Sequence, residues 1–284
     1  MKPIKIMTDT CSDITPAVAE KYGIELLPIH IIFGEKEYLD GFEISAEEFY
    51  AMLETGSDSP KTAQITVQEH IDAFEKLADE YEIIYVPISA AASGTFQSAN
   101  LAKNTVMDNN PDAKIHVFEN CTFSYGYGLW VIEASKMAKE GKSADEILKM
   151  LDEKIHSTDV ILNVPSLDYL QRGGRISSAT KIIANVLDIN PILAIEGGLV
   201  VNRSKVRGSK KVIGKMVDMV MENSNGDYDQ TICILSGNAP ETAEKVINTF
   251  KEKTPFKNFV NEQVGPCIGT HTGPGVFGII YQKK

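Results

Sequence analysis

The sequence lacks the patterns that identify several large classes of enzyme and metalloprotein. Its four cysteines include no pair at CxxC spacing, and no cysteine–histidine group has the spacing of a zinc site. The P-loop pattern GxxxxGK[ST], the GxSxG elbow of serine hydrolases and the HExxH pattern of zinc proteases are also absent. The sequence therefore supports neither a nucleotide site nor these hydrolases, and we expect no metal and no cofactor.

Long hydrophobic runs and an excess of positive charge are missing as well. No apolar stretch approaches the roughly 20 residues of a membrane-spanning helix, and the apolar run in MKPIKIMTDT is too short for a signal peptide. The net charge of the 284 residues is −11, whereas a nucleic-acid-binding surface needs a basic stripe. Because the cysteines are also sparse, we expect a cytoplasmic protein with no integral membrane segment and no nucleic-acid partner.

The first half of the chain alternates apolar strand patterns with helix starts. Runs at Ile4–Thr8, Ile24–Phe33 and Ile83–Ile88 predict strands. Helix starts are predicted between and after them, at Thr15-Pro16 and at three capping boxes: Ser45 with Glu48, Thr66 with Glu69, and Ser143 with Glu146. This alternation predicts right-handed crossovers and a mostly parallel sheet covered on both faces, which is an α/β/α sandwich over residues 1–158.

Residues 159–284 have a different pattern. Ile192–Ile195 and Leu199–Lys205 flank Glu196-Gly197-Gly198, which is typical of a hairpin. Strands joined by tight turns, together with helical patterns, predict an α+β domain with a mixed or antiparallel sheet. The predicted fold class is therefore α/β with two domains, residues 1–158 and 159–284, and such a pair commonly holds a ligand between its members.

The turn after the strand Ile83–Ile88 carries the clearest signal for an anion site. Ser93-Gly94-Thr95 lies where the strand gives way to a helix. Gly94 allows a ligand to approach the backbone closely, and the free N–H groups and positive dipole of a helix start favour an anion. The alternative is that Ser93 only caps the helix, but a cap needs one hydroxyl and this turn supplies more.

Two other polar segments admit a structural and a functional interpretation. Thr8-Asp9-Thr10-Cys11-Ser12-Asp13 follows the first strand, at the end where open α/β sheets bind ligands. Taken singly, however, Asp9 and Ser12 are explained by hydrogen bonds to amides of the turn. In the segment KTAQIT (residues 61–66), Thr66 is a cap, whereas Thr62 fits a loop residue and a ligand contact equally well.

The remaining candidates are one histidine and several arginines. His271 lies in the segment 265–275, a predicted Gly- and Pro-rich loop, and its ring can donate a hydrogen bond to a carboxylate or phosphate. A purely structural histidine is the alternative. Arg172 and Arg175 suit a phosphate or a partner protein, or stabilise a turn. Arg203 alternates with the next basic residues of its strand, so we expect a basic face that suits an anionic partner.

Taken together, the motifs resemble the DegV family, bacterial fatty-acid-binding proteins of which some are binding subunits of a fatty acid kinase. The resemblance covers essentially the whole chain. It rests on the order and spacing of TDTCSDI, KTAQIT, ISAAASGTFQSA, FSYGYG, LDYLQRGGRIS, NPILAIEGG and GTHTGPGVFGI. The sequence departs from the family pattern at a few positions, while Thr62, Ser93 and His271 remain; the departures are Thr10-Cys11, Ala63, Ala90, Ala92 and Glu119-Asn120.

The resemblance implies a ligand and a site. A long-chain fatty acid such as palmitate would lie in an apolar tunnel beneath the interdomain cleft. Its carboxylate would be held by Thr62 and Ser93, with His271 close by. Supporting residues would be Gly94, Thr95, Thr8, Asp9 and Ser12.

The resemblance also implies a role in fatty acid and phospholipid-precursor metabolism. The protein would be a carrier without catalytic residues, which presents the bound acid to a partner fatty acid kinase for phosphorylation. Arg172, Arg175 and Arg203 would face that partner or the phosphate. The alternative function is an enzyme that uses His271 or Ser93 in phosphoryl or acyl transfer.

Overall fold

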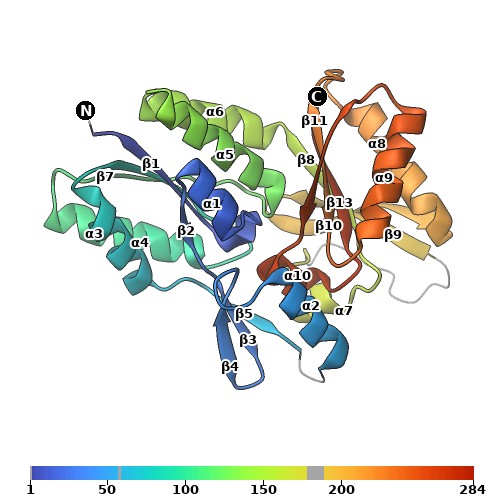
Figure 1. Ribbon diagram of the computed structural model, residues 1–284, viewed down its shortest axis with the longest axis horizontal. Helices are drawn as coiled ribbons and strands as arrows, with labels where there is room; N and C mark the ends of the chain where they lie inside the picture. The colour runs from blue at the N-terminus through green and yellow to red at the C-terminus, as the bar shows by residue number, and fades with distance from the viewer. Residues whose placement is uncertain (1, 57–58, 178–188) are drawn as a thin grey trace.

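The computed structural model describes residues 2–56, 59–177 and 189–284. Within these residues the chain forms two sheets flanked by helices and a third, small sheet (Figure 1). The first sheet is parallel throughout, as predicted. Its strands, in order across the sheet, are β2 (Glu25–Leu27), β1 (Ile4–Asp9), β6 (Glu82–Val86) and β7 (Lys114–Val117).

Helices cover both faces of this sheet, so the central strands are buried over Ile6–Asp9 of β1 and Ile83–Val86 of β6. Ile6 packs in the cluster that includes residues of α5, whereas its neighbour Met7 packs with α3 and α4, because successive strand residues point to opposite faces. The helices of this half are α1 (Pro16–Tyr22), α2 (Ala46–Thr55), α3 (Val67–Ala78), α4 (Thr95–Asn109), α5 (Tyr125–Lys139) and α6 (Ala144–His156).

The helix starts follow local sequence signals. The predicted capping boxes begin α2, α3 and α6 with both reciprocal hydrogen bonds formed. Thr15 caps α1, and Pro16 occupies its first turn. These predictions are confirmed because each depends only on residues within one turn of the helix start.

The second sheet is mixed, as predicted, since β11 and β12 pair in parallel and the other neighbours pair antiparallel. Its order is β10 (Leu199–Arg207), β9 (Ile189–Glu196), β8 (Thr158–Asn163), β13 (Phe277–Gln282), β11 (Thr231–Ser236) and β12 (Asn258–Gln263). The predicted hairpin joins β9 and β10. Helices α7 (Asp168–Gly173), α8 (Val212–Asn223) and α9 (Pro240–Lys253) accompany it. The domain boundary between 158 and 159 remains a prediction.

A third sheet was not predicted. The apolar run Ile24–Phe33 was interpreted as one strand, which is wrong, because the chain leaves the first sheet after Leu27. Pro28, which has no N–H to donate, stands between β2 and the next strand. The small antiparallel sheet contains β3 (His30–Phe33), β4 (Lys36–Leu39) and β5 (Lys61–Ala63).

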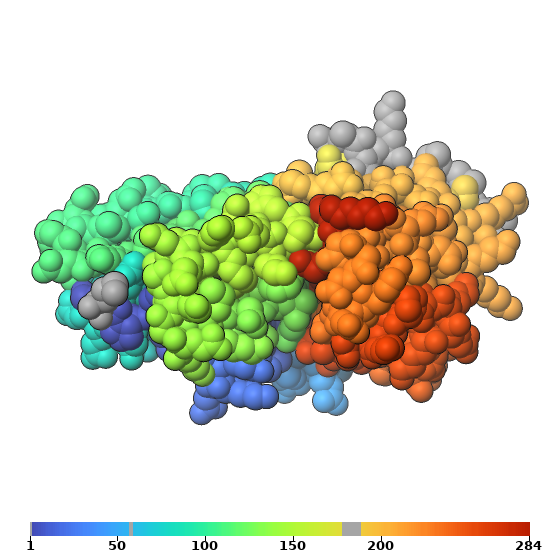
Figure 2. All heavy atoms as spheres, turned by 90° about the horizontal axis from the view of Figure 1, so that it is seen from above, coloured from blue at the N-terminus to red at the C-terminus, as the bar shows by residue number. Residues whose placement is uncertain are grey.

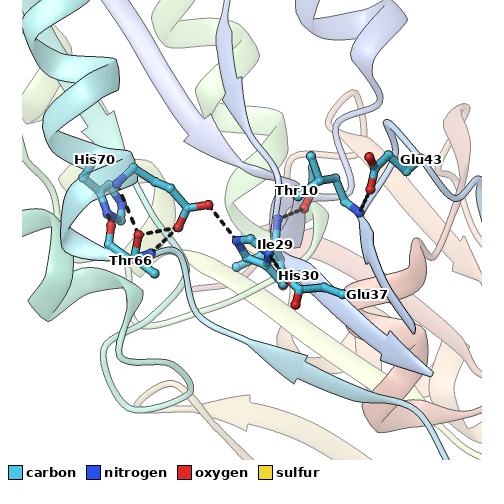
Figure 3. Close-up of polar contacts among 9 residues, drawn as sticks. Thr10, Ile29, His30, Glu37, Glu43, Thr66 and His70 are labelled. Carbon is cyan, nitrogen blue, oxygen red and sulfur yellow. Dashed lines mark hydrogen bonds and ion pairs between the residues drawn. The ribbon is translucent and has the colours of Figure 1, made fainter. Parts of the chain in front are cut away.

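Figure 3 shows polar contacts within this small sheet and between it and its surroundings. His30 Nδ1 lies 2.5 Å from Glu37 of β4, and His30 Nε2 lies 2.8 Å from Glu69 of α3. The amide of Ile29 donates to the hydroxyl of Thr10 over 3.0 Å. The sheet that carries Thr62 is therefore fixed to both α3 and the segment after β1.

The prediction of a loop over residues 265–275 is wrong for most of that segment. Pro266–Thr272 forms a helix, α10, with proline in its first turn. Gly269 makes this helix possible at its location, since a Cβ there would lie 2.8 Å from the Phe49 ring and 2.9 Å from the Tyr50 hydroxyl. Gly269 thus serves close helix packing, whereas Gly273 and Gly275 have positive φ in the turn after the helix. Figure 1 shows α10 at the junction of the two halves, and Figure 2 shows the surface of α5 and α6 directly against that of the second half. Among the described residues, no helix is both long enough and apolar enough to cross a membrane.

Candidate functional site

A cavity of about 180 Å³ lies where the two halves meet, beside the carboxyl ends of β1 and β6. This edge of a parallel sheet is where open α/β folds bind ligands. The first half contributes Cys11, Ile29, Thr62, Ala63, Gln64, Ile88, Ala92, Ser93, Gly94 and Phe123, and the second contributes Leu170, Arg175, Val200, Cys267, Ile268, His271 and Thr272. The three residues predicted to hold a carboxylate all line this one cavity.

Thr62 and His271 meet across the junction of the halves. The Thr62 hydroxyl lies 3.0 Å from Nε2 of His271, although the two residues are 209 apart in sequence. Thr62 occupies β5, paired with Ile31 of β3, so the small sheet determines its direction. This contact joins a strand of the first half to α10 of the second.

His271 is held as a neutral ring. Its burial, and the nearby positive charge of Arg175, lower its pKa to about 4. Its Nδ1 is buried and has no hydrogen-bond partner in the described structure. A Cβ on Gly173 would lie 2.1 Å from Nδ1, so only glycine fits beside the ring. This packing explains one glycine of the QRGGR segment.

The turn of residues 87–95, here the β6 turn, presents Ser93 to the cavity. The Ser93 hydroxyl lies 3.0 Å from that of Thr95 and accepts a hydrogen bond from the Thr95 amide at 3.3 Å. Gly94 is the N-cap residue of α4 and provides no side-chain cap. A Cβ on Gly94 would lie 1.9 Å from Oε1 of Gln64, so the amide of Gln64 occupies the space that the glycine leaves.

The turn of residues 8–13, here the β1 turn, has a different use for its polar groups. Thr8 donates to the Val86 carbonyl at 2.8 Å, and Ser12 donates to the Asp9 carbonyl at 2.7 Å. Asp9 accepts from the amides of Cys11 and Ile88 and from the Tyr127 hydroxyl. Thr8, Asp9 and Ser12 are buried and do not line the cavity. These three residues therefore support the site indirectly, because they stabilise the backbone next to the cavity.

The three arginines lie in different places. Arg175 lines the cavity and donates to the carbonyls of Ala92 at 3.0 Å and Gly173 at 2.5 Å. Arg172 is exposed, with Nη1 donating to Ser59 at 2.8 Å and its guanidinium 4.7 Å from the Tyr169 ring centre. Burial of Arg175 lowers its pKa, but an arginine remains charged at neutral pH.

Arg203 is not brought to the cavity. It pairs with Asp159 at 2.5 Å and Glu196 at 2.8 Å. A register shift between Asn202 and Ser204 interrupts the alternation along β10, so the expected single basic face does not continue through Arg203. Two carboxylates already neutralise this cation.

The remaining wall of the cavity is mainly apolar. Phe123 and Ile268 line it and also line a second, small apolar cavity of about 20 Å³. The other side chains around that second cavity include Leu162, Leu235 and Val264. Phe123 and Ile268 therefore belong to a wall that the two cavities share. In the described parts of the chain, no three side chains of His, Cys, Asp or Glu are grouped to hold a metal ion.

Comparison with known proteins gives this arrangement a family. The family model described as "Uncharacterised protein, DegV family" matches residues 3–284. The chain belongs to the DegV family. A DegV domain-containing protein of Caldanaerobacter subterraneus is 35% identical over 286 residues, which cover 100% of both chains. This confirms the resemblance inferred from the motifs.

Two solved structures share the fold over their whole length. DegV of Bacillus subtilis, described as a fatty acid binding protein, has a TM-score of 0.87 and 29% identity, with 100% of each chain covered. A fatty acid binding DegV family protein of Streptococcus agalactiae has a TM-score of 0.88 and 27% identity, again with 100% of each chain covered. The predicted fold class, an α/β protein with a parallel first sheet and a mixed second sheet, is confirmed.

Sequence reasoning missed two parts of the cavity. Gln64 packs over Gly94 and donates to the Ser98 hydroxyl at 2.8 Å; its place in KTAQIT was the only available signal. Cys11 and Cys267 form a disulfide in the cavity wall. They are 256 residues apart, so no local spacing could have paired them.

Proposed function

We propose that this protein binds a long-chain fatty acid in the cavity, with the carboxylate at Thr62, Ser93 and His271. One observation carries the proposal: Thr62, Arg175 and His271 line the part of the cavity that adjoins an outer pocket, whereas Phe123 and Ile268 line the part that adjoins a small apolar cavity. The Bacillus subtilis and Streptococcus agalactiae structures are of fatty acid binding proteins with the same fold, which supports this ligand class.

The polar end suits a carboxylate because its groups replace water. Burying a carboxylate without partners is very unfavourable. Thr62 and Ser93 can donate hydroxyl hydrogens, the helix start at Thr95 offers N–H groups, and Arg175 supplies a positive charge. The Nε2 atom of His271, which lies 3.0 Å from the Thr62 hydroxyl, is a further polar atom at this end of the cavity.

The apolar wall suits an acyl tail. Each buried CH₂ group contributes about 0.8 kcal/mol, so a chain of a dozen or more carbons supplies ample binding energy. The tail would run from the polar end toward Phe123 and Ile268, and separation of these two side chains would join the main cavity to the small apolar one. These two residues are therefore expected to limit acyl length.

Presentation of the head group to a partner kinase is the second part of the proposal. An outer pocket of about 450 Å³ shares Thr62, Arg175 and His271 with the cavity and adds Lys61 and Arg172. A carboxylate at the shared residues would thus be reachable from outside the cavity. The cations at this mouth suit the charge of an incoming phosphoryl group.

The enzyme alternative has less support. A serine hydrolase would need Ser93 hydrogen-bonded to a base. In the described structure the Ser93 hydroxyl instead contacts Thr95, and His271 contacts Thr62. The low pKa of His271 also makes it a weak base at neutral pH. A turnover by the purified protein alone that Ser93→Ala abolishes would contradict the carrier proposal.

Titration of delipidated protein with palmitate by calorimetry tests the site. Thr62→Ala is expected to weaken binding about 10- to 100-fold, since a charge-assisted hydrogen bond contributes about 1.5–3 kcal/mol. The matched control is Thr66→Ala, which removes an exposed cap of α3 that does not line the cavity and should leave affinity unchanged. No binding by the unmodified protein, or equal affinity in Thr62→Ala, would refute the assignment. Mass spectrometry of an organic extract identifies the acid that the purified protein carries.

A further inference from the structure

The cavity wall contains a feature that neither carboxylate nor tail binding explains. Cys11 and Cys267 are disulfide-bonded, with Cα atoms 5.7 Å apart, a separation normal for a disulfide. Cys11 belongs to the β1 turn and Cys267 to α10, so the bond joins the two halves of the molecule. The other two cysteines, Cys121 and Cys233, are unpaired.

We propose that Cys11 and Cys267 form a reversible thiol–disulfide site, which reacts with small thiols and disulfides and sets the affinity of the cavity for its ligand. The coupling to affinity rests on the fatty acid function proposed above. The site itself follows from the position of both sulfur-bearing residues in the cavity wall.

The cavity provides the route for such reagents. The two cysteines are only 1% and 4% exposed, yet both line the cavity. A small thiol or disulfide therefore reaches them from inside the cavity rather than from the outer surface. A fatty acid in the cavity would cover the sulfur atoms, so occupancy would slow their reaction.

The disulfide is positioned to control the carboxylate site. Cys267 and His271 are four residues apart on α10, which places them on the same face of that helix. The bond therefore fixes the helix that brings His271 to Thr62. In the reduced state the two sulfur atoms are no longer bonded, and they must separate to van der Waals contact.

Without the bond, only weaker contacts hold the start of α10 at this place. The Cys267 amide donates to Asp40 at 3.1 Å, and the Gly265 amide donates to Asp13 at 2.9 Å. On the other side of the bond, the Cys11 amide donates to Asp9 at 3.0 Å. Reduction leaves these hydrogen bonds in place but removes the covalent link, so the preorganisation of His271 and Thr62 decreases.

One molecule of a small disulfide is enough to oxidise the two cysteines to the Cys11–Cys267 bond. The thiolate of one cysteine attacks a sulfur atom of the reagent. This cysteine then forms a mixed disulfide with one half of the reagent, and the other half leaves as a small thiol. The second cysteine then attacks the protein sulfur atom of that mixed disulfide and releases the other small thiol. The protein loses two thiol protons and two electrons, and the reagent becomes two thiols. Excess dithiol reverses both steps.

Palmitate titration of the two redox forms tests the proposal. The protein is oxidised with oxidised glutathione or reduced with dithiothreitol, and alkylation with peptide mapping verifies the state of each cysteine. We expect the oxidised form to bind about tenfold more tightly, because preorganised sites bind more strongly. Cys121→Ser should keep this difference, and the Cys11→Ser/Cys267→Ser double variant should lose it.

The outcomes separate this proposal from the one on which it rests. Equal palmitate affinity in verified oxidised and reduced protein would overturn the coupling and leave fatty acid binding intact. Absence of binding in both forms would refute the fatty acid function and the coupling with it. A second measurement needs no variant: saturating palmitate should slow the reduction of the Cys11–Cys267 bond several-fold, and an unchanged rate would show that the cavity is not the route.

Discussion

The β1 turn and the β6 turn follow adjacent strands of the same parallel sheet, and both are rich in hydroxyl groups. In the β1 turn the polar groups hydrogen-bond within the protein. Thr8 and Ser12 donate to main-chain carbonyls, and Asp9 accepts hydrogen bonds from three donors. In the β6 turn, Ser93 lines the cavity. The hydroxyl and carboxylate groups of two turns at the same sheet edge therefore serve the framework in one case and the cavity in the other.

The difference arises from what packs over each turn. The β1 turn lies beneath α10 and α5, where it contacts Gly265 and Tyr127 through Asp13 and Asp9. The β6 turn packs against Gln64, the residue that follows β5, for which Gly94 leaves room, and both residues line the cavity. Burial thus determines whether a hydroxyl or carboxylate stabilises the fold or remains for a ligand.

Among the substitutions that test this difference between the turns, we expect the largest effect at Asp9. Asp9→Ala leaves the amides of Cys11 and Ile88 and the hydroxyl of Tyr127 without their acceptor. We expect the free energy of unfolding to fall by about 3–5 kcal/mol, since each unpaired buried group costs about 1–3 kcal/mol. Urea denaturation measures it, with Ser93→Ala as the control. If Asp9→Ala lowers the free energy of unfolding by less than about 1 kcal/mol, the β1 turn does not have the stabilising role assigned to it.

The second effect is a pH dependence that Asp13 of the β1 turn and the neighbouring Asp40 should produce. Burial raises the pKa of Asp13 to about 7 and of Asp40, which packs beside it, to about 8, from 3.8 in an unfolded chain. The folded state therefore holds protons that the unfolded state has released, so the contribution of these groups is present at low pH and is lost as pH rises toward 8.

Measurement between about pH 6.5 and 8.5 isolates this effect. His271 has the opposite sign, because its lowered pKa removes stability only as pH falls from 6.5 toward about 4. Over the upper range we expect the free energy of unfolding to decrease by on the order of a few kcal/mol. Asp40→Asn should flatten the curve. A stability that rises with pH over that range would contradict the assignment.

A matched pair of serines sharpens the comparison further. Ser12 is buried and donates to the Asp9 carbonyl at 2.7 Å, whereas Ser93 lines the cavity. Ser12→Ala should lower the free energy of unfolding by about 1–3 kcal/mol, and Ser93→Ala should instead weaken palmitate binding about tenfold or more. Denaturation and calorimetry on both variants give a crossed pattern. The reverse pattern would exchange the roles of the two turns.

Local signals explain which parts of the fold could be predicted. The capping box at Ser45 and Glu48 and the hairpin at Glu196-Gly197-Gly198 are complete within a few residues, and the structure contains both. The helix α10 was missed because Gly269 and the glycines on either side of the helix look like loop residues until the packing of Gly269 against Phe49 and Tyr50 is known. Sequence patterns therefore predict elements whose causes are local.

The site was only partly predictable, for the same reason. Thr62, Ser93 and His271 were singled out from their segments and the family resemblance, and the structure brings them to one cavity. The Thr62–His271 contact and the Cys11–Cys267 bond span 209 and 256 residues. The ion pairs of Arg203 with Asp159 and Glu196 and the register shift beside it could not be read from a regular strand pattern, and its role toward a partner stays a prediction.

The smallest effect concerns the second hydroxyl of the β6 turn. Thr95 is buried and does not line the cavity, but its hydroxyl lies 3.0 Å from that of Ser93. Thr95→Val keeps the side chain's shape and removes this partner, so Ser93 loses only its orientation. We expect palmitate affinity to fall about threefold, corresponding to a net hydrogen-bond contribution of about 0.5–1 kcal/mol.

The matching change in the β1 turn is Thr8→Val, which removes the bond to the Val86 carbonyl and should lower stability without altering affinity. If Thr95→Val lowers affinity as strongly as Ser93→Ala, the ligand is bound by the pair of hydroxyls and not by Ser93 alone.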